Sequence, residues 1–120
     1  MEDKIDVAIT SEDNVTVVSF NATSISDVEG ITSAGEKIRE FIENHRLSGL
    51  VFDFSGVKFL CSQVLGLLLD VRARLQAHQA EVVISAINPQ LHRVFKITNL
   101  DKIFRFFPDR KTAVKAIKTG

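Results

Sequence analysis

Two short, almost uninterrupted apolar runs constrain the fold of this chain more than any other feature: residues 50–54 (LVFDF) and 81–87 (EVVISAI). A strand with one face in water alternates apolar and polar side chains, whereas a strand covered on both faces reads as a continuous apolar run. Each run is followed by a segment whose apolar residues have helical spacing. The two runs therefore predict parallel strands in the middle of a sheet that helices cover.

The rest of the chain continues this alternation of strands and helices. Further strands are expected at three places: 4–9, 15–20 and 103–107. Turn residues at 11–14 predict a hairpin between the first two strands, and the segment 21–27 is assigned no regular structure. Four helices are expected: one that contains 34–42, then 62–78, 89–97 and 109–117. The order β-β-α-β-α-β-α-β-α predicts a single α/β domain over residues 1–120, with a mixed sheet, helical crossovers and an antiparallel strand at one edge.

Polar residues at the expected helix ends predict how the helices begin and stop. The first helix has two candidate capping boxes, Ser33 with Glu36 and Ser26 with Glu29, and the sequence leaves both open. Three further positions are expected to cap or end helices: Asn88 before Pro89, Asn99 and Asp109.

The charge composition argues against classes of partner that act through a strong overall field. Fifteen basic and fifteen acidic side chains cancel, so we expect no direct contact with nucleic acid and no attraction to an anionic membrane. Acidic residues gather near the start of the chain and basic residues near its end. Solvated surface faces and a basic C-terminal docking patch both account for that asymmetry.

The single cysteine and the N-terminal segment indicate the compartment. One cysteine, Cys61, excludes an intramolecular disulfide and favours a reducing environment. The first ten residues (MEDKIDVAIT) lack the positive flank and apolar run of a signal peptide. No apolar run approaches the roughly 20 residues that a membrane-spanning helix needs. We expect a cytoplasmic protein without membrane insertion.

The sequence contains no recognisable catalytic, cofactor or metal-binding motif. It has no glycine-rich phosphate loop and no metal-ligand spacing, so no cofactor and no metal are expected. Cys61 could imitate a thiol–imidazole pair with His45, His78 or His92, but these histidines lie on different expected helices. Asp53 ends a buried strand, where it is either a functional group or the cap of the Ser55–Gly56 turn. We therefore expect a non-enzymatic binding module.

The segment that begins at Ser62 has two apolar stripes on a helical wheel. The first is an obvious core stripe: Val64, Leu67, Leu68, Val71 and Leu75. The second consists of small and apolar residues: Ser62, Gly66, Leu69 and Ala73, with Leu65 between the two stripes. A neighbouring helix of the same domain, or an exposed docking surface with Ser62 at its edge, would each account for the second stripe.

Ser62 is expected to be the N-cap of this helix. A serine there accepts a hydrogen bond from an amide of the first turn, worth about 1 kcal/mol. Phosphorylation would add roughly −1.5 to −2 charges at the positive end of the helix, so the helix would tolerate it.

The middle stretch VFDFSGVKFLCSQVLGLLL and the order of elements resemble the STAS domain of bacterial anti-sigma factor antagonists. That family has an apolar strand, a short loop, the motif Asp-Ser-Ser-Gly-Leu-Gly and then a helix. The later stretch VVISAINPQLHRVFKITNLDKIFRFFPD is similar to the family's strand, proline-capped helix and last strand. The resemblance covers roughly 4–117 and implies the STAS fold.

The resemblance also implies a function and a site. In the family, a partner that is both a serine kinase and an anti-sigma factor phosphorylates the first serine of the motif, and the phosphorylated antagonist releases that partner. The matching phosphoacceptor is Ser62, and the implied partner-binding residues surround it: Cys61, Gln63, Leu65, Gly66 and Leu69. Leu65 and Gly66 match the family's Leu-Gly, whereas the family's Asp, second Ser and Gly are replaced by Cys61, Gln63 and Val64.

Two alternatives stay open within the same resemblance. The chain could be an accessory STAS subunit of a transport machine, or a constitutive protein-interaction module without phosphorylation. The sequence does not identify the sigma factor or the oligomeric state.

Overall fold

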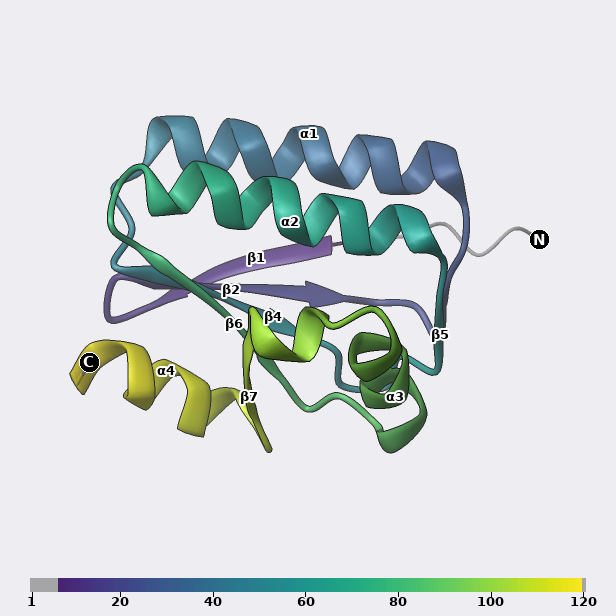
Figure 1. The fold of residues 1–120 in the computed structure, drawn as a ribbon. Helices are drawn as coiled ribbons and strands as arrows, with labels where there is room; N and C mark the ends of the chain where they lie inside the picture. The colour runs from purple at the N-terminus through teal and green to yellow at the C-terminus, as the bar shows by residue number, and fades with distance from the viewer. Residues whose placement is uncertain (1–6, 120) are drawn as a thin grey trace.

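The computed structural model describes residues 7–119, which form a five-stranded sheet with helices on both faces (Figure 1). The main sheet contains β1 (Val7–Glu12), β2 (Val15–Phe20), β4 (Gly49–Asp53), β6 (Glu81–Ser85) and β7 (Arg105–Phe107). The helices are α1 (Val28–Asn44), α2 (Ser62–Gln76), α3 (Pro89–Ile97), the short 3-10 helix η1 (Leu100–Lys102) and α4 (Arg110–Thr119). Helices α1 and α2 lie side by side on one face, and α4 lies on the other (Figure 1).

The strand order β1-β2-β4-β6-β7 confirms the predicted mixed α/β sheet. The β1–β2 pair is antiparallel and lies at one edge, and the other three pairs are parallel. The central strand β4 is buried along its whole length. Its Leu50 and Phe52 join the core beneath α1 and α2, whereas Val51 joins a second core beneath α4. Helices on both faces explain why this strand reads as a continuous apolar run.

The hairpin between β1 and β2 turns on two residues rather than four. Asp13 and Asn14 both have positive φ angles, 53° and 69°, as a two-residue hairpin turn of type I′ requires. Ser11 and Glu12, expected in the turn, instead belong to β1. Residues 4–6 of the first predicted strand lie outside the described residues.

Most of the predicted helix ends are confirmed, but both candidate capping boxes of α1 are wrong. The helix begins at Val28 with Asp27 as its N-cap, since the first helical hydrogen bond runs from the Ile31 amide to the Asp27 carbonyl. Neither Ser26 nor Ser33 occupies that position.

The other caps are made as expected. The Leu91 amide donates to the Asn88 side chain at 2.8 Å, and Asn99 has a left-handed φ of 62°. The Thr112 amide and hydroxyl both donate to the Asp109 carboxylate. These two hydrogen bonds hold the pKa of the Asp109 carboxyl below its ordinary value. The last strand begins at Arg105, two residues later than expected, because the amides of Ile103 and Phe104 donate to the Leu100 carbonyl of η1.

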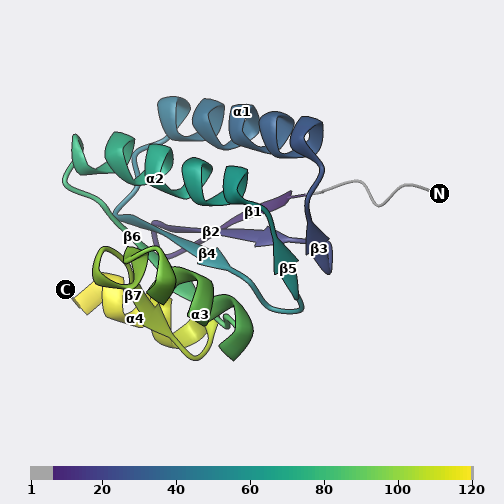
Figure 2. The ribbon, with the colours of Figure 1, turned by 45° about the vertical axis from the view of Figure 1, so that its right-hand side comes forward.

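The segment predicted to be irregular contains a short strand that the sequence pattern does not reveal. Strand β3 (Ser24–Ile25) pairs in parallel with β5 (Phe59–Leu60), the residues directly before α2 (Figure 2). Backbone bonds extend the pairing, from the Lys58 amide to the Thr23 carbonyl at 2.7 Å and from the Cys61 amide to the Ile25 carbonyl at 2.9 Å. This small ladder fixes the start of α2 to the chain that leads into α1.

An ion pair between the buried Asp53 and the partly exposed Arg110 ties α4 to the end of β4. Asp53 is 4% exposed, and its Oδ2 accepts hydrogen bonds from Nε and Nη2 of Arg110 at 3.0 and 2.7 Å. Its Oδ1 accepts from the Ser55 amide and the Ser85 hydroxyl, and Arg110 also donates to Ser19 at 2.8 Å. The predicted turn-capping role of Asp53 is confirmed, and the carboxylate also links β4 to β6 and α4, while Arg110 extends the link to β2.

Replacing Arg110 by methionine should destabilise the domain by roughly 2–3 kcal/mol, because the buried Asp53 carboxylate loses its counter-charge. The matched control is Arg105→Met, which removes an exposed ion pair with Glu81 and should cost less than about 1 kcal/mol. Urea denaturation of both variants measures the difference. Equal losses of stability would contradict the role given to the buried pair.

Candidate functional site

The site centres on the junction between β5 and α2. Cys61 has an extended backbone (φ −95°, ψ 169°) and is the N-cap of α2, and its amide is held by Ile25. Ser62 is therefore the first residue of the helix, so the prediction that Ser62 caps the helix is wrong. The Cys61 side chain makes no capping hydrogen bond either. The Cys61 carbonyl instead accepts a bond from the Val64 amide at 3.0 Å.

The Ser62 side chain is exposed and is not needed to hold the fold. Its Oγ donates a long hydrogen bond of 3.5 Å to Oε1 of Gln63, a length at the outer limit for such bonds. Because the hydroxyl has no capping role, it faces solvent at the positive end of a 15-residue helix. A modifying group on this oxygen would displace no structural contact beyond Gln63.

The second stripe of α2 is on the surface. Ser62, Gly66, Leu69 and Ala73 are all exposed, whereas the core stripe is buried. Helix α1 packs against the other side of α2: a Cβ at Gly35 would lie 3.1 Å from Cδ1 of Leu67. Of the two interpretations of the second stripe, the neighbouring helix is therefore wrong, and the exposed face remains.

Two residues close to Ser62 are buried: Leu65, which was predicted to contact the partner, and Val64. Leu65 is only 9% exposed and belongs to the core, so it supports the surface from beneath. Val64 is 0% exposed. The valine that replaces the family's glycine therefore adds no bulk at the edge where a partner would dock.

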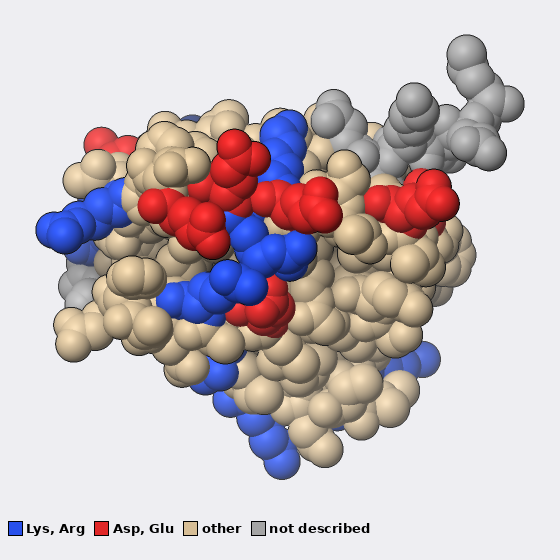
Figure 3. All heavy atoms as spheres, turned by 90° about the horizontal axis from the view of Figure 1, so that it is seen from above, with Lys and Arg blue, Asp and Glu red and all other residues tan. Residues whose placement is uncertain are grey.

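The stretch around Ser62 carries no charge between Lys58 and Asp70. Residues 59–69 contain no acidic or basic side chain, and Phe59 and Leu69 are 64% and 37% exposed. A Cβ at Gly66 would meet no heavy atom within 4 Å, so the backbone there is open to close approach. Seen from above the helices, charged side chains gather away from a broad uncharged area on the side where α2 begins (Figure 3). We call the exposed residues Phe59, Ser62, Gln63, Gly66 and Leu69, together with the half-buried Cys61, the α2 surface.

Within residues 7–119, the side chains form neither the thiol–imidazole pair nor a metal site. No hydrogen bond joins Cys61 to a histidine within residues 7–119, and the His92 ring packs instead on Phe106 at 4.6 Å. In the same described range, no group of three or more His, Cys, Asp or Glu side chains is placed to hold a metal ion. None of the helices there is both long enough and apolar enough to cross a membrane.

Comparison with known proteins gives a match to the STAS domain family over residues 6–113. An anti-sigma factor antagonist from Mycobacterium paratuberculosis is 28% identical, with a TM-score of 0.80 over 95% of this chain and 94% of that one. A STAS domain protein from Planctomyces limnophilus has a TM-score of 0.85 at 19% identity, covering 93% and 97% of the two chains.

A third relative has been solved in two states. The Bacillus anti-sigma factor antagonist SpoIIAA in its unphosphorylated form has a TM-score of 0.84 at 16% identity, over 96% of this chain and 98% of that one. Its phosphorylated form has a TM-score of 0.73 at 15% identity, over 94% and 98%. At such identities these likenesses show the fold. The family match spans most of the sequence, and the chain belongs to the STAS domain family.

Proposed function

We propose that this protein is a regulatory binding module of the anti-sigma factor antagonist type. In this proposal the α2 surface binds an anti-sigma factor that is also a serine kinase, and phosphorylation of Ser62 releases that partner. One observation carries the proposal. Ser62 is exposed, does not cap α2, and lies at the edge of an uncharged, partly apolar surface. The relatives support it, since they include an anti-sigma factor antagonist at 28% identity and an antagonist solved with and without phosphate.

The physics of the surface suits such a switch. A phosphate on Ser62 would place roughly −1.5 to −2 charges beside Phe59, Gly66 and Leu69. Forcing an uncompensated charge into an apolar contact costs several kcal/mol, and about 1.4 kcal/mol already changes an affinity tenfold. The helix itself would tolerate the charge, because its amino-terminal dipole is positive. Binding would therefore be lost while the fold is kept.

The replacement of the family's acidic residue by Cys61 does not remove this mechanism. Cys61 is partly buried and packs against the core, and its backbone amide keeps the hydrogen bond that positions Ser62. The position of the serine is thus set by the β3–β5 ladder and does not depend on a neighbouring side chain. A kinase would still meet the hydroxyl at the start of an anchored helix.

Substitutions at two adjacent leucines of α2, one exposed and one buried, test the α2 surface. Leu69→Glu should abolish binding to the host's anti-sigma factor kinase without unfolding the domain, because Leu69 is 37% exposed. Leu68→Glu is the matched control: Leu68 is 0% exposed, so the same change should unfold the protein. Circular dichroism reports the fold, and isothermal titration calorimetry reports binding. A folded Leu69→Glu variant that binds like the wild type would exclude this surface.

The switch is tested at Ser62 itself. After incubation with the host's anti-sigma factor kinase and ATP, intact mass should show one added phosphate on the wild type and none on Ser62→Ala. Ser62→Glu should weaken binding by at least about tenfold, whereas Ser33→Glu, at an exposed serine of α1, should not. If the wild type binds the kinase but is not phosphorylated, the protein is a constitutive interaction module and the proposed switch is wrong.

A further inference from the structure

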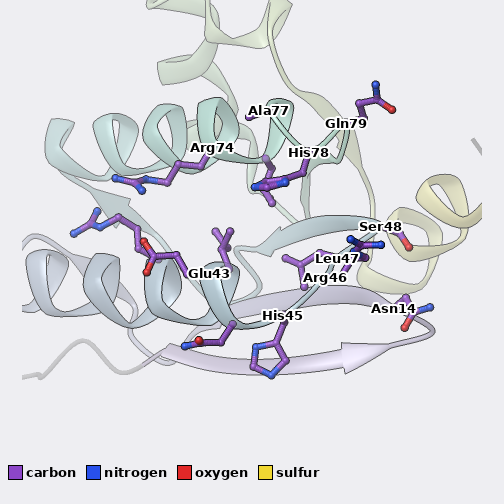
Figure 4. A pocket seen from close by; sticks show the side chains of 14 residues that line it. Asn14, Glu43, His45, Arg46, Leu47, Ser48, Arg74, Ala77, His78 and Gln79 are labelled. Atoms are coloured by element: carbon purple, nitrogen blue, oxygen red, sulfur yellow. The ribbon is translucent and has the colours of Figure 1, made fainter.

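A second site lies at the end of α2 that is farthest from Ser62. An open groove of about 1260 Å³ runs between the carboxyl ends of α1 and α2 and reaches the β1–β2 turn at Asn14 (Figure 4). Arg74, the first residue of α2 that lines the groove, follows Ser62 by twelve residues, about 18 Å along the helix axis, and follows Leu69 by five, about 7.5 Å. The groove therefore shares no residue with the α2 surface and lies well away from Ser62.

The charged side chains that line the groove are mostly cationic. Three arginines, Arg39, Arg46 and Arg74, face one lining carboxylate, Glu43. Nη1 of Arg39 and Nε of Arg74 share a single oxygen of Asp70, each at 3.2 Å. Within residues 7–119, Arg46 is exposed and takes part in none of the ion pairs. The groove thus holds more positive charge than its own carboxylates neutralise.

The carbonyl groups at the two helix ends do not compete for a cation. The Asn44 side chain donates to the Glu40 carbonyl at 2.9 Å, and the His45 ring lies 2.9 Å from the Phe41 carbonyl. At the end of α2, the Ala80 amide donates to the Leu75 carbonyl at 2.9 Å. These bonds occupy three carbonyls near the two helix ends. The arginines of the groove supply guanidinium donors, whose planar geometry matches carboxylates.

The shape of the groove fits a chain better than a small molecule. Its volume exceeds the roughly 300–1,000 Å³ of ordinary small-molecule pockets, and it is open along one side. Arg74 and Arg46 lie toward opposite ends of it (Figure 4). Ile42 and Leu75, both buried, and the half-buried Leu47 form apolar lining between the charges. A ligand that pairs with these arginines and also contacts the apolar lining needs anionic groups at intervals and apolar groups between them.

We propose that this groove binds an acidic, partly apolar peptide segment of a partner protein. The carboxylates of the segment bond to Arg46 and to the Arg39–Arg74 pair, and its apolar side chains pack on the half-buried Leu47. The site adds a second interaction surface to the domain, and it does not depend on phosphorylation at Ser62.

The test uses the whole protein and a short synthetic peptide in which glutamate alternates with leucine. Titration of the ¹⁵N-labelled protein should give saturable amide shifts at His45, Arg46, His78 and Gln79. Arg46→Glu should weaken this binding by at least about tenfold, because it reverses an exposed charge that takes part in none of the ion pairs among residues 7–119. The matched control is Arg93→Glu, an exposed arginine of α3 outside the groove, which should bind the peptide like the wild type.

Three further arms make the result decisive. A lysine–leucine peptide should not bind, and Ser62→Glu should bind the acidic peptide as the wild type does, which separates this site from the proposed switch. Sodium pyrophosphate should bind much more weakly than the acidic peptide. Absence of saturable shifts, equal weakening by Arg93→Glu, or pyrophosphate binding as tight as that of the peptide would each overturn the proposal, the last in favour of a small-anion site.

Discussion

The burial of β4 on both faces is the constraint on which the rest of the structure depends. A parallel strand in the middle of a sheet is stable only where helices exclude water from each side. Leu50 and Phe52 require α1 and α2 above them, and Val51 requires α4 below. The same requirement places Asp53 under α4, out of water, where Arg110 compensates its charge. The sheet, its helical layers and the ion pair at Asp53 thus depend on a single strand.

The site depends on a second, smaller restraint. The β3–β5 ladder holds the backbone of Cys61, so that α2 starts at a fixed place and turns one stripe of small residues outward. The domain therefore presents a preformed surface instead of a mobile loop. A preformed uncharged surface loses little conformational entropy on binding, and one added phosphate changes it strongly. These properties suit the proposed binding module.

Sequence reasoning predicted the features that local pattern determines. The apolar runs identified β4 and β6, and the Asn88 and Asp109 caps were located because a cap depends on residues a few positions away. The β3–β5 ladder was missed, because two-residue strands have no periodicity. The Asp53–Arg110 pair was missed, because its members are 57 positions apart. The N-cap of α2 is one residue earlier than predicted. The extended backbone of Cys61 sets it there, although serine is the better capping side chain.

In the proposed function the partner binds on the α2 surface. Amide chemical-shift mapping of the ¹⁵N-labelled protein in complex with the host's anti-sigma factor kinase locates the contact without any substitution, because it reports on each backbone amide. The largest shifts should fall within 59–69, with little change along α4. Shifts concentrated on α4 or at the ends of α1 and α2, with 59–69 unchanged, would contradict it.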